Sequence, residues 1–106
     1  PETIALETSL FDASTSNYIL LNFVHVLDPG LRGEVTIEAY DGNTWHEVAA
    51  YSSATANPET EIVDLSAVAG GITNARIRFI WSGDGEGFWA IDNIRIYASL
   101  PLDGGP

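Results

Sequence analysis

A carboxylate in the middle of an apolar segment is the first feature of this sequence that could carry chemistry. Residues 87–96 read GFWAIDNIRI, and Asp92 is the acidic residue in this run. Burying an unpaired charge costs several kcal/mol, so something must neutralise Asp92. Strict alternation along a strand places Asp92 on the core side together with Phe88 and Ala90. A β-bulge at Asp92 and Asn93 instead shifts the phase of the strand, and we favour it because it turns the larger side chains inward. These side chains are Trp89, Ile91, Ile94 and Ile96.

Two kinds of partner suit a carboxylate at a bulge. The bulge leaves main-chain carbonyl oxygens unpaired, and together with a carboxylate they suit Ca²⁺, which takes about six to eight oxygen ligands at about 2.3–2.6 Å. In the alternative, Asp92 accepts hydrogen bonds from backbone N–H groups or from Asn93 at the bulge and binds no metal. The residues alone leave both interpretations open.

Aromatic side chains are the second candidate for a binding site, because sugar rings stack on Trp and Tyr while their hydroxyls reach polar neighbours. Trp81 lies at a predicted strand end beside the glycine-rich acidic loop 83–87, and Tyr40 and Trp45 lie near another predicted hairpin tip. We predict a sugar-binding platform from these three aromatic residues, with Asp84 of the loop as a polar contact. The alternative for each ring is packing in the core or at its rim.

The sequence lacks the constellations of a catalytic site. His25 and His46 fall on different predicted strands, and neither has a Cys or a second His at the spacing of a zinc site. No Ser lies in a G-x-S-x-G nucleophile elbow. Glu34, Glu38 and Glu47 lie on outer strand faces, where carboxylates are normally solvated and do not form the pair that a glycosidase needs. We therefore predict a non-catalytic protein in which His25 is a half-buried, hydrogen-bonded side chain.

The charge balance restricts the partners. The chain has 15 Asp and Glu residues against four Arg and no Lys, which gives a formal charge of −11. Such a surface repels nucleic-acid phosphates and anionic membranes, so we expect neither as a partner. No apolar run approaches the roughly 20 residues that span a bilayer, so no membrane insertion is expected. The sequence has no Cys, which excludes disulfides and is compatible with export.

Almost every segment has the pattern of a β-strand. Residues 34–40 (EVTIEAY) alternate, and so do residues 75–81 (ARIRFIW), with Arg76 and Arg78 opposite the apolar side chains. The stretch 41–43 (DGN) predicts a tight hairpin turn with a structural role. The predicted strands are 3–10, 17–27, 34–40, 44–51, 59–65, 75–81 and 88–97, and a turn or short helix is predicted over 67–71. About seven short strands in 106 residues predict one all-β domain, an antiparallel β-sandwich of jelly-roll type.

In this order the segments resemble the jelly-roll modules grouped as MAM-like or choice-of-anchor J domains, which have relatives among reelin-type repeats and carbohydrate-binding modules. The resemblance covers residues 3–98. It is carried by the stretches 5–12 (ALETSLFD), 21–25 (LNFVH), 41–45 (DGNTW), 62–66 (IVDLS), 77–79 (IRF) and 87–94 (GFWAIDNI). It implies that Asp92 in the closing stretch is a calcium ligand, with Glu7 predicted as a second carboxylate and Asp12 as a third.

The resemblance also bears on the partners of the domain. Modules of this kind usually have further residues, including a first strand, before the point where this chain begins. An uncovered edge strand invites pairing with a neighbour, so we expect a homo-oligomer or a partner chain that completes the sheet.

Taken together, the sequence predicts a non-catalytic, calcium-stabilised accessory module of a secreted or cell-surface bacterial protein. The module is predicted to span residues 1–98, with 99–106 as a linker or tail. Extracellular carbohydrate, a polysaccharide, is the predicted ligand. The alternative is a structural or protein-interaction module that docks against a neighbouring domain or chain.

Overall fold

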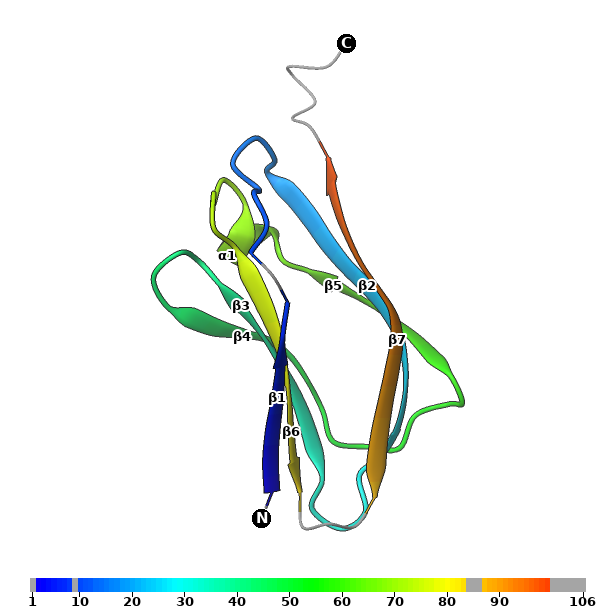
Figure 1. Cartoon of the computed structure of the whole chain (residues 1–106). Helices are drawn as coiled ribbons and strands as arrows, with labels where there is room; N and C mark the ends of the chain where they lie inside the picture. The colour runs from blue at the N-terminus through cyan, green and yellow to red at the C-terminus, as the bar shows by residue number, and fades with distance from the viewer. Residues whose placement is uncertain (1, 9, 84–86, 100–106) are drawn as a thin grey trace.

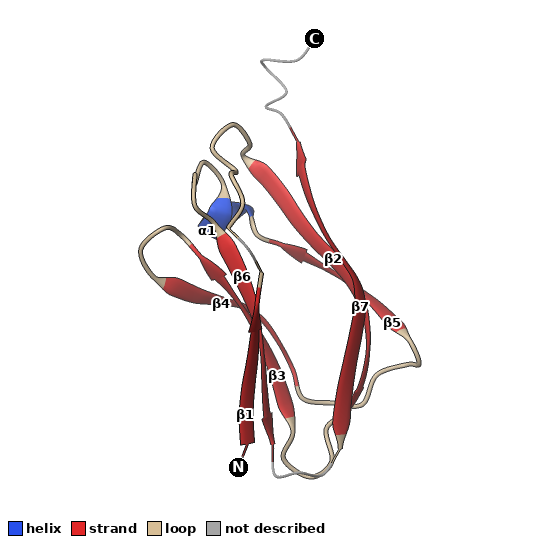
Figure 2. Cartoon of the chain, viewed as in Figure 1, coloured by secondary structure: helices blue, strands red, loops and turns tan. Residues whose placement is uncertain are grey.

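The computed structural model of the chain describes residues 2–8, 10–83 and 87–99. These residues form seven β-strands and one turn of helix, arranged as two packed sheets (Figure 1). The elements are β1 (Glu2–Glu7), β2 (Tyr18–Asp28), β3 (Glu34–Tyr40), β4 (Trp45–Tyr51), β5 (Glu59–Asp64), α1 (Ser66–Ala69), β6 (Arg76–Gly83) and β7 (Phe88–Ser99). Strands make up both layers, and α1 lies at one end of them (Figure 2). Within the described residues no helix is long and apolar enough to cross a membrane.

Two antiparallel sheets face each other across the core. Sheet I has the strand order β1-β6-β3-β4, and sheet II has the order β5-β2-β7. The chain changes sheet at every connection except the β3–β4 hairpin. This arrangement confirms the predicted antiparallel β-sandwich. It also leaves β1 and β7 at the edges of their respective sheets.

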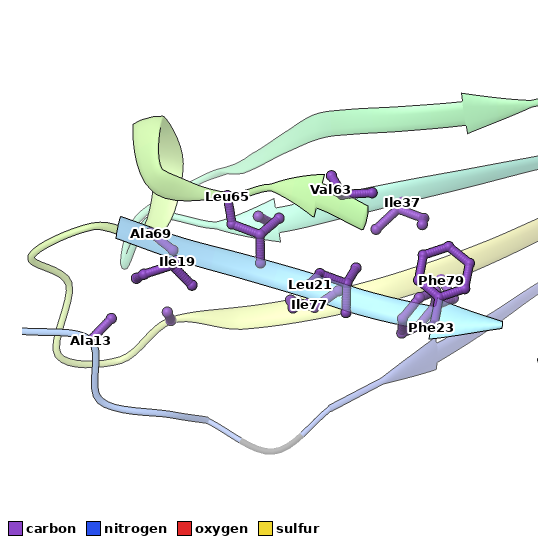
Figure 3. Packing of buried hydrophobic residues seen from close by; sticks show 12 residues of the cluster. Ala13, Ile19, Leu21, Phe23, Ile37, Val63, Leu65, Ala69, Ile77 and Phe79 are labelled. Carbon is purple, nitrogen blue, oxygen red and sulfur yellow. The ribbon is translucent and has the colours of Figure 1, made fainter. Parts of the chain in front are cut away.

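The core lies between the sheets because the strands bury every second side chain. β2 alternates in this way from Ile19 to Leu27, and β3 does so around Ile37. Phe23 of β2 meets Phe79 of β6 edge-on, with ring centroids 5.8 Å apart and planes at 80° (Figure 3). The predicted inward faces of residues 34–40 and 75–81 are therefore confirmed.

β7 contains a bulge one residue beyond the predicted position, at Asn93 and Ile94 instead of Asp92 and Asn93. Its register against β2 shifts between Asn22 and Val24, where one residue of β2 faces two residues of β7. Asn93 lies in the bulge with φ of 54°, a conformation that Asn tolerates better than most residues. Asp92 is consequently exposed, so the expectation that a buried carboxylate must be neutralised here is wrong: the bulge turns Asp92 to the outer face of sheet II. Its carboxylate accepts a hydrogen bond of 2.8 Å from the Asn93 backbone N–H. The side chains that pack against the core are the predicted ones, Trp89, Ile91, Ile94 and Ile96.

Some boundaries differ from the prediction. β1 ends at Glu7, before the predicted end at residue 10, and the segment before β2 contributes an isolated bridge from Phe11 to Ala75. The predicted turn or short helix is the single helical turn α1. β7 runs to Ser99, past the predicted strand end at residue 97. Residues 100–106 of the predicted tail lie outside the described residues, and the module boundary stays a prediction.

Candidate functional site

The turn between β3 and β4 positions two of the predicted ligand-binding residues. The carboxylate of Asp41 accepts hydrogen bonds from the backbone N–H groups of Thr44 at 2.7 Å and Asn43 at 2.8 Å, and it lies 2.8 Å from His46 Nε2. Gly42 has φ of 93°, which a residue with a Cβ rarely adopts. The pKa of the Asp41 carboxyl is held well below its usual range by these hydrogen bonds. The largest effect comes from the Thr44 N–H, followed by His46 and the Asn43 N–H. The predicted structural role of this turn is confirmed.

Tyr40 and Trp45 form an aromatic pair next to this turn. They lie opposite each other on β3 and β4, with ring centroids 5.1 Å apart and planes tilted by 46°. Because Ile37 and Ala39 of β3 point into the core, Tyr40 points to the outer face of sheet I. Both rings are half-buried, so each keeps a solvent-facing part.

Arg78 and Glu38 complete a site around this pair. The guanidinium carbon of Arg78 lies 4.1 Å from the centroid of the Trp45 ring, a cation–π contact. Nε and Nη2 of Arg78 both lie 2.6 Å from Glu38 Oε1. An ion pair and a ring thus fix the guanidinium from two sides. We refer to Tyr40, Trp45, Arg78 and Glu38 as the aromatic platform.

Arg76 extends the same face towards β1. It lies opposite Tyr40 on β6, and its Nη2 is 3.2 Å from Glu7 Oε1. Both arginines on this face are therefore paired with glutamates. The face offers aromatic surface, guanidinium donors and the acceptor oxygens of Glu38, which together suit a polyhydroxylated ligand.

Trp81 does not lie beside Tyr40 and Trp45, although the sequence predicts one platform from the three residues. It continues the inward row of β6, so it is on the opposite face of sheet I. Its indole lies so close to Gly33 that a Cβ there would be 2.7 Å from Trp81 Cη2. The predicted three-ring platform is not formed. The fourth predicted contact, Asp84, lies outside the described residues.

Trp81 instead lines an apolar groove between the edges of the two sheets. We call it the β1/β7 groove; its volume is about 350 Å³. Its lining residues are Ile4, Leu6, Phe79, Trp81, Gly87, Phe88, Trp89 and Ile91. The groove has the apolar character of a core, yet it opens at the side of the sandwich where β1 and β7 lack a further strand neighbour among the described residues.

The three carboxylates predicted as calcium ligands do not come together. Asp92 points outward from sheet II, whereas Glu7 points outward from sheet I and pairs with Arg76. Asp12 accepts the backbone N–H of Ser14 at 2.9 Å, and hydrogen bonds from the Ser14 hydroxyl and N–H lower the pKa of Asp12. Within residues 2–8, 10–83 and 87–99, no three His, Cys, Asp or Glu side chains gather to hold a metal. Calcium binding by this chain stays a prediction.

A chain of side-chain hydrogen bonds links the three strands of sheet II. His25 Nδ1 accepts a hydrogen bond of 3.0 Å from Trp89 Nε1, and His25 Nε2 lies 3.1 Å from Glu61 Oε2. Because an indole N–H only donates, the His25 proton is on Nε2 and is donated to Glu61. The His25 side chain is 0% exposed, so it does not contact any external substrate. Burial, and then the carboxylates of Glu61 and Glu59, raise the pKa of the neighbouring Tyr51 to about 12.

The predicted hydrogen bonding of His25 is confirmed, but its burial is complete where the sequence predicts half. The sequence does not indicate its partners, because β5 and β7 flank β2 only after the long-range pairing of sheet II. The same holds for Arg78 and Glu38, which come from β6 and β3. The alternation of β6 and β3 places both residues outward, and their pairing depends on the strand register.

Comparisons with known proteins support the fold. No protein-family model matches the chain, and no curated protein matches its sequence. Among solved structures the chain is similar to TmCBM61 in complex with beta-1,4-galactotriose, with a TM-score of 0.62 and 10% sequence identity. The similarity covers 92% of this chain and 62% of that one, so the chain spans less than two thirds of the length of that structure. At this identity the likeness shows the fold alone, and it agrees with the predicted jelly-roll β-sandwich. The resemblance to MAM-like domains stays a prediction.

Proposed function

We propose that this chain is a non-catalytic module that binds a neutral polysaccharide on the aromatic platform. The observation that carries the proposal is the Tyr40–Trp45 pair on the outer face of sheet I, with Arg78 fixed against Trp45 and Glu38. A sugar ring has apolar C–H faces that pack on aromatic rings. Its hydroxyls both donate and accept hydrogen bonds, which matches a guanidinium beside a carboxylate.

The charges of the site favour a neutral ligand over an acidic one. Arg78 and Arg76 are the cations on this face, and each is already paired with a carboxylate, Glu38 or Glu7. An anionic sugar would have to displace one of these glutamates and approach a chain with a formal charge of −11. A neutral glycan meets neither cost.

The platform is also pre-organised. Asp41 fixes the turn that joins β3 to β4, so Trp45 is held beside Tyr40 without the ligand. A site whose side chains are already ordered loses less conformational entropy on binding. The likeness to TmCBM61, whose structure contains beta-1,4-galactotriose, supports a neutral glycan as the first ligand to test.

The test is a binding series with soluble polysaccharides. Isothermal titration against neutral glycans, beginning with β-1,4-galactan, is expected to show binding, whereas polygalacturonate is expected to show none. Trp45→Ala should weaken the interaction by about tenfold or more, as truncation of an aromatic anchor does when it costs at least about 1.4 kcal/mol. Tyr40→Ala should act in the same direction.

Trp81→Phe is the matched control, because Trp81 lies on the opposite face of sheet I. It should leave glycan affinity unchanged. Equal affinity of Trp45→Ala and the unmodified chain would contradict the assignment of the platform. If no neutral glycan in a broad panel binds, the proposed function itself is contradicted, and a structural or protein-interaction module is favoured.

We further propose that the module is an accessory part of a secreted or cell-surface protein, in keeping with the acidic, Cys-free composition. Calcium at Asp92 belongs to the same proposal. What supports it is the position of Asp92 beside a bulge, whereas the hydrogen bond that Asp92 accepts from the Asn93 N–H matches the alternative without a metal.

A further inference from the structure

The side of the sandwich formed by β1 and β7 is incomplete as a monomer surface. β1 and β7 each have a strand neighbour on one side only, so their outer main-chain groups have no ladder partner within the described part of the chain. Between them the β1/β7 groove exposes large apolar side chains: Ile4 is 61% exposed, Leu6 53% and Phe88 54%. Open strand edges beside a contiguous apolar surface are typical of a docking surface for another strand.

β7 carries opposite charges at positions that match under a two-fold axis. Asp92 and Arg95 both point outward from sheet II, on the two sides of the bulge at Asn93. Arg95 has no ion pair with any residue that the structure describes, and the Asp92 carboxylate accepts only the Asn93 N–H there. If two copies of β7 pair antiparallel about an axis at the bulge, Asp92 of each copy faces Arg95 of the other. A contact between identical copies requires this kind of self-complementarity.

The bulge also allows apolar side chains of the two copies to face each other on the inner side of the sheet. Side chains alternate between the two faces of a regular strand, so residues 92 and 95, three positions apart, would point to opposite faces. Pairing Asp92 with Arg95 would then set inward side chains of one copy against outward side chains of the other. The bulge shifts the phase once, so Ile91 and Ile96 both point inward and face each other in the same pairing. Ile96 of the second copy would then lie beside Ile91 and Leu6 in the β1/β7 groove.

We propose that a second copy of this chain docks along β7 and covers the β1/β7 groove. The two copies join their sheets II into one continuous sheet, with two Asp92–Arg95 pairs across the axis. The long-range charge opposes this association, because each copy carries −11. Salt screens that repulsion, since the Debye length falls from about 30 Å at 0.01 M to about 8 Å at 0.15 M, so association strengthens with salt.

The aromatic platform and the β1/β7 groove lie on opposite faces of sheet I. The platform residues come from β3, β4 and β6 and point outward, whereas the groove residues of β1 and β6 point inward; β4 is the edge of sheet I opposite β1 (Figure 1). A dimer through β7 leaves both platforms open, so a polysaccharide with repeated binding sites would gain avidity from two of them. The dimer does not depend on glycan binding, and its test needs no glycan.

The test measures the mass of the purified chain by light scattering and sedimentation over a concentration series. We expect a two-chain mass at high concentration and a dissociation constant that falls as salt rises. Arg95→Asp and Asp92→Arg should each weaken self-association by at least about tenfold, because both symmetric pairs become like-charged. An equimolar mixture of the two variants should form the dimer again, because each Asp then faces an Arg.

Glu47→Arg is the matched control for Asp92→Arg. Glu47 is an exposed glutamate on β4, so this reversal should leave dimerisation intact. Circular dichroism establishes that every variant is folded, and the rescue in the mixture does not depend on either variant alone. A single-chain mass at all concentrations would overturn the proposal, as would a dimer that ignores both reversals or a mixture that associates no better than its parts.

Discussion

His25 is buried more completely than any other polar side chain that the structure describes, and its environment explains how the core tolerates it. Both ring nitrogens are used, one by the Trp89 indole N–H and the other by Glu61. Buried polar groups are stable when every hydrogen-bonding atom has a partner and costly when one is lost. Trp89 therefore has two roles, since it packs against the core and satisfies the histidine.

Trp89→Phe tests this second role. The change keeps an aromatic ring in place but removes the N–H, so His25 Nδ1 is left as a buried acceptor without a donor. We expect the free energy of unfolding to fall by about 1–3 kcal/mol, measured by urea denaturation. Trp45→Phe, on the outer face, should change it by no more than about 0.5 kcal/mol. Equal losses in the two variants would show that ring size and not the hydrogen bond is responsible.

Among the elements, the β3–β4 hairpin is the one that brings the residues of the aromatic platform together. Alternation fixes the faces of both strands, and Asp41 fixes the turn between them. The ladder then brings Tyr40 and Trp45 into contact, and β6 supplies Arg78. None of these rings or charges would form a site on an isolated strand, because each contact joins neighbouring strands.

Asp41→Asn tests the turn and has a defined pH dependence. The folded state lowers the pKa of Asp41, so its contribution to stability is present above the unfolded pKa of about 3.9 and is lost as the pH falls through that value towards the lower folded pKa. The variant should have a lower thermal midpoint than the unmodified chain at neutral pH. The difference between the two should shrink as the pH falls below about 4.

Circular dichroism melts over a pH series measure this difference. Glu47→Gln on the same hairpin removes a carboxylate outside the turn and is the control. A constant difference at all pH values would mean that the Asp41 charge does not stabilise the turn. Glycan affinity should fall together with the stability of the turn, because Trp45 follows it directly.

Across the whole molecule, the net charge of −11 makes the chain attract cations and repel a second copy of itself. Like charges on one domain destabilise the compact state, so any salt should raise its thermal midpoint by screening. A stabilising effect of calcium is therefore informative only in comparison with another salt at equal ionic strength. The same field opposes dimerisation, so the local Asp92–Arg95 pairs have to offset it.

Calcium binding at Asp92 is tested by melting the chain in CaCl₂, in NaCl of matched ionic strength and with chelator. If an ion is held there, CaCl₂ raises the midpoint beyond the NaCl value, chelator reverses the rise, and Asp92→Asn removes it. Identical midpoints in the two salts would eliminate the metal. In that case the bulge N–H and Arg95 of a second copy remain as the partners of Asp92.

Local sequence patterns were sufficient to predict the strands, their inward faces and a bulge near Asp92. Strand alternation and turn residues are local signals, and burying the larger side chains at 89, 91, 94 and 96 required a phase shift at Asp92. Which side chains meet across strands depends on the fold. The sequence grouped Trp81 and Trp45 in one sugar-binding platform, yet Trp81 lines the β1/β7 groove and Trp45 pairs with Tyr40 and Arg78. The reason is that cross-strand contacts depend on strand order and register, which long-range pairing sets and local sequence patterns do not encode.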